Sequence, residues 1–171
     1  KKLDLSNFDT SRVTTMNRMF SGCSSLETLI LSQNFKTNKV TDMEAMFSSC
    51  TLLTSLDLSN FNTDNVLNMR AMFMNMQNIK EIQISHLNFG KVKDLAYIFN
   101  SCRKLENIDV SNIEAPNVIT MQDSFSDCVS LKSLNFEKFN GRLVESWYNA
   151  FYGDYSLESI NLSGFDTSNS V

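Results

Sequence analysis

Two short apolar patterns alternate along the whole chain, and together they recur about every 26 residues. The first is a triplet with apolar residues at both ends and, in most copies, a polar residue between them. This two-residue period is typical of a strand with one buried face. Its seven copies are Leu3–Leu5, Leu29–Leu31, Leu56–Leu58, Ile82–Ile84, Ile108–Val110, Leu134–Phe136 and Ile160–Leu162. Each copy is too short to be stable alone, so we expect it to pair in parallel with the copy from the next repeat.

The second pattern predicts a short helix. Met16, Met19, Phe20 and Cys23 have the i, i+3, i+4, i+7 spacing of one helix face. The phenylalanine returns at the same phase in six copies: Phe20, Phe47, Phe73, Phe99, Phe125 and Phe151. Before each predicted helix stands a good N-cap residue: Thr15, Asp42, Asn68, Asp94, Thr120 or Ser146. A residue that is small or tolerates a left-handed conformation marks each predicted end: Gly22, Ser49, Asn75, Ser101, Asp127 and Gly153.

A period of this length predicts stacked repeats that bury one shared core. Successive phenylalanines are 27, 26, 26, 26 and 26 residues apart. We therefore predict an α/β solenoid, a right-handed coil with one parallel β-sheet wall of about seven short strands and short helices on the opposite wall. Two further columns should point inward: the series from Phe8 to Phe165 and the series from Val13 to Val144. Residues 1–171 then form a single repeat domain of six full repeats with partial ends, which we expect to be a fragment of a longer array.

Composition and charge restrict the class of partner. Hydrophobic residues make up 42% of the chain and charged residues 20%, as in ordinary soluble globular domains. The formal net charge is −4, which argues against the basic surface that a nucleic-acid-binding protein needs. No apolar run approaches the roughly 20 residues of a membrane span. We therefore expect no nucleic-acid partner and no direct insertion of this segment into a membrane.

The residues that could carry chemistry do not form a catalytic or metal-binding pattern. The single histidine, His86, occupies a turn slot in which other repeats carry asparagine, so it has no second histidine to work with. Cys23, Cys50, Cys102 and Cys128 share one repeat slot rather than a CxxC pair. We predict no enzyme, no cofactor and no metal. Buried thiols are the favoured state of the cysteines, and disulfides Cys23–Cys50 and Cys102–Cys128 stay open as the alternative.

The outward face of the predicted sheet is the candidate binding surface. It carries short polar side chains, several of them acidic, and extended surfaces of this kind bind protein ligands in repeat proteins. The residues predicted to face a ligand are Asp4, Asp57, Glu81, Gln83, Asp109, Asn135 and Asn161. The alternative is that this polar surface only keeps the sheet soluble.

The repeat consensus reads L-x-x-L-x-L-S-N-F-x-T-x-x-V-x-x-M-x-x-M-F-x-x-C. The segment LDLSNFDTSRVTTMNRMFSGCSSLETLILS, and the copies after it over the whole chain, resemble the BspA-type leucine-rich-repeat surface proteins of bacteria. The copies that begin at Leu87 and Ile113 lose the Phe-x-Thr part, so we expect their loops to follow a different path. The resemblance implies a leucine-rich-repeat-like coil in a protein that is secreted or held at the bacterial cell surface.

Two functions therefore compete at this point. The first is an extracellular adhesion module that binds a protein or glycan ligand, on a host or a neighbouring cell, through the surface of the coil. The second is a structural spacer or stalk that has no ligand of its own and holds another domain away from the cell.

Overall fold

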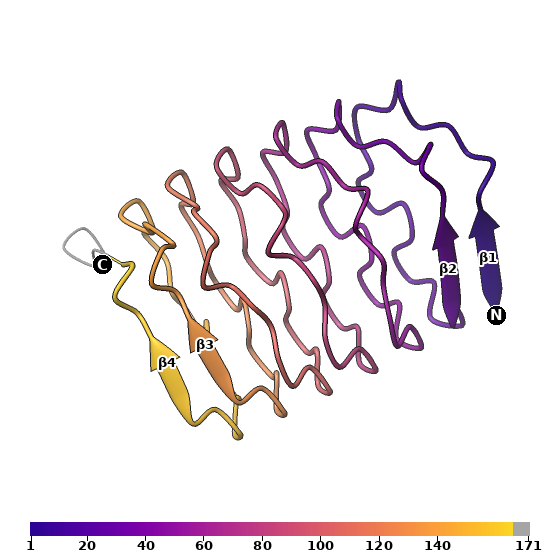
Figure 1. The fold of residues 1–171 in the computed structure, drawn as a ribbon. Coiled ribbons are helices and arrows are strands. Elements are labelled where there is room, and N and C mark those ends of the chain that lie inside the picture. Colours follow the sequence, from indigo (N-terminus) through magenta and orange to yellow (C-terminus); the bar gives the residue numbers. More distant parts are fainter. Residues whose placement is uncertain (166–171) are drawn as a thin grey trace.

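In the computed structural model, which describes residues 1–165, the chain winds through successive coils stacked side by side (Figure 1). We number the coils 1 to 6 by the phenylalanine that each contains: Phe20, Phe47, Phe73, Phe99, Phe125 and Phe151. The rings of these residues form one continuous column with centroids 5.3–6.1 Å apart. The repeat period of the sequence is therefore the length of one coil.

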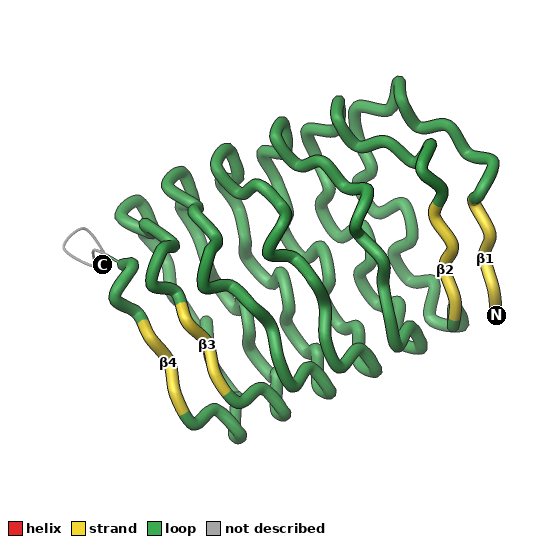
Figure 2. The backbone as a smooth tube through the Cα atoms, viewed as in Figure 1, coloured by secondary structure: helices red, strands yellow, loops and turns green. Residues whose placement is uncertain are grey.

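Within residues 1–165, strands occur only near the two ends of the stack (Figure 2). β1 (Lys2–Leu5) pairs in parallel with β2 (Thr28–Leu31), and β3 (Ser133–Asn135) pairs in parallel with β4 (Ser159–Asn161). Leu3 lies opposite Leu29 and Leu134 opposite Ile160, which is the register that the repeat predicts. Between these pairs, within the described residues, the triplets 56–58, 82–84 and 108–110 form no strand, and one isolated bridge joins Glu81 to Asn107.

No helix is present among residues 1–165, and the six segments predicted as helices are runs of turns. In coil 1 the N–H groups of Met19, Ser21 and Cys23 donate to carbonyls three residues back. The alternate N–H groups, such as those of Arg18 and Phe20, donate to carbonyls of coil 2. An α-helix would need every one of these groups to bond four residues back along its own chain. Bonding to the next coil replaces that pattern, because a helix of two turns is marginal by itself.

Each of the six turn runs contains two residues with positive φ, at the second residue before and the second after its phenylalanine. They are Arg18 and Gly22, Ala45 and Ser49, Ala71 and Asn75, Tyr97 and Ser101, Asp123 and Asp127, and Asn149 and Gly153, with φ between 50° and 78°. The six predicted helix-end residues all belong to this set, so their tolerance of the left-handed region was interpreted correctly. The helix predicted before each of them is wrong. A residue four positions earlier, such as Arg18 before Gly22, already has the same left-handed conformation and interrupts helical geometry.

The six predicted N-cap residues form a column of parallel bridges, Thr15–Asp42–Asn68–Asp94–Thr120–Ser146. In five of the six, from Thr15 to Thr120, the side chain accepts the backbone N–H two residues on, as Asp42 Oδ1 does from Glu44 at 3.0 Å and Asp94 Oδ1 from Ala96 at 2.8 Å. This is the hydrogen bond of an Asx turn. The prediction that these residues cap helices is therefore wrong, because a run of turns follows them, although the bond from the side chain to the backbone is present.

The predicted α/β solenoid, a right-handed leucine-rich-repeat-like coil with a wall of about seven strands and an opposite wall of helices, is therefore wrong in this form. The coils are joined instead along the segments from Thr15–Gly22 to Ser146–Gly153, which we call the turn wall. At each of its five junctions four N–H groups of one coil donate to four carbonyls of the next, at 2.7–3.2 Å. The side that carries the Leu-x-Leu triplets, which we call the strand wall, is paired only in part.

The core between the two walls contains the apolar columns that the repeat places there. In the middle coils the methionine, phenylalanine and valine columns are fully buried, as Met46, Phe47 and Val66 show. The column from Phe8 to Phe165 is buried from Phe35 to Phe139, whereas Phe8 in coil 1 is 52% exposed. The shared apolar interior is the part of the fold prediction that the structure bears out.

The threonine of the Phe-x-Thr signature links neighbouring coils from inside. Thr37 is fully buried, and its hydroxyl accepts the N–H of Asn62 and donates to the carbonyl of the same residue, both at 2.7 Å. Thr63 bonds Asn88 in the same way. In the copy that begins at Ile113, Ala115 occupies this slot and its own N–H donates to a carbonyl of coil 6. These later loops keep their inward positions but bond differently.

Candidate functional site: the outward face of the strand wall

The predicted ligand-facing residues lie along the outward face of the strand wall. Asp4, Asp57, Glu81, Gln83, Asp109 and Asn161 are exposed, and Asn135 is half-buried. The inward and outward alternation holds even where no strand forms, because Ile82 and Ile84 are 4% and 2% exposed on either side of Gln83. Residues of this set come from every coil except coil 2, where Ile30 occupies the slot, and run from one end of the stack to the other. They form a ladder rather than one converging site.

The aspartates and asparagines of this ladder also have a structural task. Asp57 Oδ1 accepts the N–H of Ser59 at 2.9 Å, and Asp109 Oδ1 accepts both the N–H and the hydroxyl of Ser111. The hydrogen bonds from the serine side chain, and next those from the serine backbone, hold the pKa values of both carboxyl groups below their ordinary range. Asn135 and Asn161 make the same turn in later coils. The recurring Asp-x-Ser spacing is the signal in the sequence from which this role could have been found.

One shallow hollow brings two of the predicted residues together. Asp109 in coil 5 and Asn135 in coil 6 both line a cavity of about 280 Å³. Its remaining lining residues are Asn107, Ile108, Val110, Ser111 and Ser133. Asn107 and Ser133 were not among the predicted site residues, although both are exposed and polar. The structure does not bring Asp4, Asp57, Glu81, Gln83 or Asn161 into this hollow.

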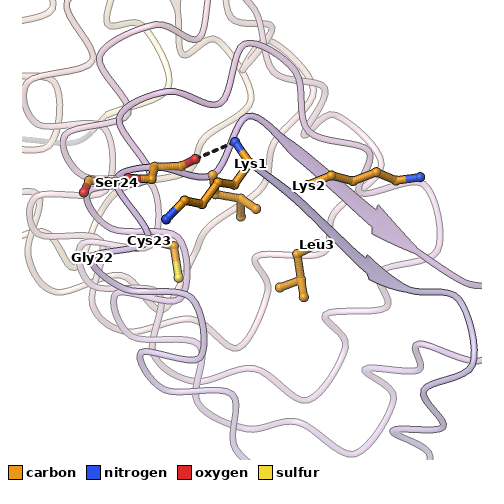
Figure 3. A pocket seen from close by; sticks show the side chains of 8 residues that line it. Lys1, Lys2, Leu3, Gly22, Cys23 and Ser24 are labelled. Carbon is orange, nitrogen blue, oxygen red and sulfur yellow. Dashed lines mark hydrogen bonds between the residues drawn. The ribbon is translucent and has the colours of Figure 1, made fainter.

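Other hollows formed by the described residues lie outside the strand face. One of about 320 Å³ is at the first coil, where the amino-terminal ammonium of Lys1 donates to the carbonyl of Ser25 at 2.8 Å, beside Cys23 (Figure 3). One of about 400 Å³ lies over Ala45 and Ala71 on the turn wall, and one of about 230 Å³ is at the sixth coil. The hollow on the turn wall includes Arg70, whose guanidinium lies 4.7 Å from the ring centre of Tyr97 and pairs with Asp94 at 3.5 Å.

The cysteines are free thiols in the structure, which decides between the two states left open by the sequence. Cys50, Cys102 and Cys128 are buried, and each Sγ donates to the carbonyl of a phenylalanine in a neighbouring coil at 3.1–3.2 Å. Burial raises the pKa values of Cys50 and Cys102 to about 12. Thiols in this state are poor nucleophiles and fill space as small apolar groups.

No group of three or more His, Cys, Asp or Glu side chains that could hold a metal ion is found within residues 1–165. The imidazole Nε2 of His86 is 3.0 Å from the carbonyl of Leu58, a contact that ties one turn to its neighbour. In the same part of the chain, no helix has the length and apolar character that crossing a bilayer requires.

The chain matches the model of one protein family, described as "Mycoplasma protein of unknown function, DUF285", over residues 1–107 and again over residues 74–171. The two matches together span the whole sequence. The chain belongs to this family. A comparison with curated proteins and one with solved structures gave no match. The family therefore agrees in part with the resemblance noted above, without showing a BspA-type leucine-rich repeat.

Proposed function

We propose that this chain is an extracellular interaction module of a bacterial surface protein, which binds a protein or glycan ligand through the outward face of its strand wall. Three observations support the proposal: membership of the Mycoplasma family, the resemblance of the repeat to BspA-type surface proteins, and the exposed polar ladder along one face. The observation that carries it is the hollow between coils 5 and 6, which Asp109 and Asn135 line together.

The chemistry of this hollow suits a ligand rich in hydroxyl or amide groups. The amides of Asn107 and Asn135 each offer donors and acceptors, and Ser133 offers a hydroxyl. Asp109 uses Oδ1 in its turn, so Oδ2 is the oxygen left for a ligand. Ile108 and Val110 add a small apolar contribution to the lining. Polar surfaces with short side chains form wet interfaces with many hydrogen bonds, which is the kind that a surface glycan or a protein loop offers.

The test should alter the face without removing its turns. Gln83, Asn107 and Ser133 are exposed, and their side chains make no hydrogen bond with the described residues. We expect the triple variant Gln83→Lys, Asn107→Lys and Ser133→Lys to lose at least tenfold in affinity on a glycan microarray and on a panel of extracellular matrix proteins, with unchanged circular dichroism. Equal binding by this variant and the unaltered chain would contradict the proposal.

A matched control separates charge from fold. Asp57→Asn with Asp109→Asn keeps the acceptor of each turn, as Asn135 and Asn161 do naturally, and removes two negative charges. We expect this variant to retain its stability. A loss of binding here assigns the ligand contact to the carboxylates, whereas retained binding assigns it to the neutral polar groups.

The spacer function stays as the second candidate, because the turns use one oxygen of each aspartate and the turn wall joins every coil without interruption. A spacer binds no probe before or after mutation.

The proposed location has its own test, in which a membrane-impermeant biotin reagent is applied to intact cells. Labelling of the protein supports a surface location, and its protection until the cells are lysed contradicts it.

A further inference from the structure

The outer face of the turn wall has a hollow where one slot of the repeat changes from large to small residues. The slot is the second residue before each phenylalanine, and its occupants in coils 1 to 6 are Arg18, Ala45, Ala71, Tyr97, Asp123 and Asn149. The two alanines form the floor of the hollow of about 400 Å³, with Arg18 at one end and Tyr97 at the other. We call it the turn-wall hollow. Its floor belongs to coils 2 and 3, each of which has a neighbouring coil on both sides.

The turn-wall hollow has the size of a site for one small group. Small-molecule sites in proteins have volumes of about 300–1,000 Å³, and this one is at the lower end of that range. The N–H groups of Ala45 and Ala71 donate to the next coil, and their carbonyls accept the N–H groups three residues on. The backbone of the floor is therefore fully used, and side chains must recognise a ligand.

Ser48 has an unused hydroxyl at one edge of the floor. The residue lines the hollow although it is only 4% exposed. Its hydroxyl makes no hydrogen bond with residues 1–165, and Oγ is not among the fully shielded atoms that lack a partner. Because Ser48 lines the hollow, the access that Oγ retains is access to the hollow. Buried polar groups are nearly always hydrogen-bonded, so this hydroxyl indicates a missing ligand group.

Arg70 places a fixed cation at the opposite edge. Its guanidinium lies 4.7 Å from the ring centre of Tyr97, whose hydroxyl accepts the amide N–H of Gln122 at 2.7 Å. Arg70 Nη1 is 3.5 Å from Oδ2 of Asp94, yet the N–H groups of the guanidinium make no hydrogen bond with the described residues. A planar guanidinium that is held in place and has unused N–H groups can bind a carboxylate through two parallel bonds.

The one carboxylate in the lining already has partners for both oxygens. Glu44 Oε1 accepts Nη2 of Arg18 at 3.1 Å, and Oε2 accepts the amide of Asn68 at 3.3 Å. Arg18 has further N–H donors beyond the one in this pair. The lining therefore offers donors from two guanidinium groups, while its own negative charge is compensated. This combination favours a ligand with a single negative charge.

The placement of the polar groups favours a ring over a chain. Arg70 is next to the alanine slot on one side, and Ser48 is three residues beyond the slot on the other side. Arg18 closes one end. Polar groups on three edges of an apolar floor fit a ring with polar substituents around it, whereas an acidic peptide side chain has only one polar end.

We propose that the turn-wall hollow binds a uronic acid unit of an acidic polysaccharide, that is, a six-membered sugar ring with one carboxylate. The carboxylate binds the guanidinium of Arg70, ring hydroxyls bind Arg18 and Ser48, and the ring rests on the methyl groups of Ala45 and Ala71. This site is separate from the ligand face proposed for the strand wall, and neither depends on the other.

NMR titration with small probes at constant ionic strength tests the proposal. Glucuronate has both the ring and the carboxylate, glucose has only the ring, and acetate has only the charge. We expect glucuronate to shift the methyl signals of Ala45 and Ala71 with an affinity at least tenfold higher than either partial probe. The absence of a shift up to about 50 mM, or equal binding of acetate or glucose, overturns the proposal. Equal binding of N-acetylglutamate amide would assign the hollow to an acidic peptide instead.

Arg70→Gln tests the anion contact. We expect this variant to weaken glucuronate binding at least tenfold, and Arg70→Lys to weaken it as well, because an ammonium cannot form the two parallel bonds. The matched control is Arg103→Gln, which removes the same charge from an exposed arginine outside the hollow and should leave binding unchanged. Equal losses in Arg70→Gln and Arg103→Gln would mean that only the overall charge matters.

Ala71→Tyr tests the hollow itself by filling it. Arg18 and Tyr97 show that this slot accepts a large side chain at φ of 56° and 61°, close to the 53° of Ala71. Glucuronate binding should be lost with unchanged circular dichroism. Asn149→Tyr, in the same slot of coil 6 but outside the hollow, should bind normally. Binding that persists in folded Ala71→Tyr overturns the proposal, and if that variant does not fold, Arg70→Gln and its control decide.

The strand-wall variant separates this site from the proposed ligand face. The chain with Gln83→Lys, Asn107→Lys and Ser133→Lys keeps every residue of the turn-wall hollow. It should bind glucuronate like the unaltered chain, whatever happens to its binding of other ligands. Loss of glucuronate binding in this variant would place the uronic acid on the strand wall, and the assignment to the turn wall would be wrong.

Discussion

The turn wall and the strand wall enclose one core but join the coils by different means. On the turn wall each of the five junctions has four backbone hydrogen bonds, with no gap from coil 1 to coil 6. On the strand wall, two pairs of strands stand near the ends, and one bridge lies between them within residues 1–165. The hydrogen bonds of the turn wall therefore set the register of the stack. The strand wall is held in that register mainly by the packing of its buried side chains.

This difference shows that backbone pairing need not lie where the strand pattern is clearest. The Leu-x-Leu triplets alternate as strands should, and their apolar residues are buried even where they are unpaired, as at Ile82 and Ile84. The turn segments have a helical spacing, yet their alternate N–H groups pair between coils as in a parallel ladder. Backbone pairing is thus concentrated on one side of each coil, whereas buried apolar side chains come from both sides.

The strongest test of the shared core is Phe73→Ala. Phe73 is 1% exposed and stacks between Phe47 at 6.0 Å and Phe99 at 5.3 Å. Removing its ring should lower the free energy of unfolding by about 3–5 kcal/mol, because an empty aromatic site in the core loses both burial and packing. Urea denaturation measures this change. A loss below about 1 kcal/mol would mean that the phenylalanine column does not hold the coils together.

Hydrogen exchange compares the two walls directly. The amide of Phe73 donates to the carbonyl of Ile98 at 3.0 Å, whereas the amide of Ile84 makes no hydrogen bond with the described residues. We expect the Phe73 amide to exchange at least about 100 times more slowly. Glu106 is the control on the strand wall, since its amide bonds to Lys80 at 2.9 Å and should be protected. Equal exchange at Phe73 and Ile84 would remove the distinction between the walls.

Asp154→Asn tests the end of the turn wall through pH. Asp154 occupies the cysteine slot of coil 6, and burial raises its pKa from 3.8 to about 7. Because the folded chain then holds a proton that the unfolded chain releases, stability should fall as pH rises from about 4 to about 7. The side chain is only half-buried, so we expect the asparagine variant to be about 1 kcal/mol more stable at pH 8.

The same variant should match the unaltered chain near pH 4, where Asp154 is protonated in the folded state. Asparagine keeps the acceptor for the N–H of Cys128, which Asp154 Oδ1 now binds at 2.9 Å. Thermal denaturation at a series of pH values measures the difference. A difference that does not change between pH 4 and pH 8 would show that ionisation of Asp154 does not limit stability.

The smallest expected effect separates the conformation of the turn wall from its packing. Ala71 has φ of 53°, a value that costs energy for any residue with a Cβ, so Ala71→Gly should stabilise the chain by about 0.5–1 kcal/mol. Ala96, on the same wall and also buried, has no positive φ. Ala96→Gly should therefore destabilise by about the same amount. Urea denaturation of both variants is the measurement, and changes of the same sign would contradict this account.

The sequence alone was sufficient for the features that depend on burial and local conformation. The period of the phenylalanines, the inward columns, the strand register of Leu3 with Leu29, and the left-handed residues such as Asn75 could all be predicted. Each of these follows from the side chain at a position and from its nearest neighbours, so a repeated pattern contains the information. The outward placement of Gln83 and Asp109 followed in the same way.

Only the tertiary structure decided where the backbone groups bond. A spacing of i, i+3, i+4, i+7 fits a helix as well as a run of turns, because both bring those side chains to one face. The choice between them depends on whether a carbonyl such as that of Met46 stands opposite the N–H of Phe20. That carbonyl belongs to another coil, about 26 residues away, and no local pattern places it. The hollow shared by Asp109 and Asn135 was likewise not predictable, because it forms only once the coils are stacked.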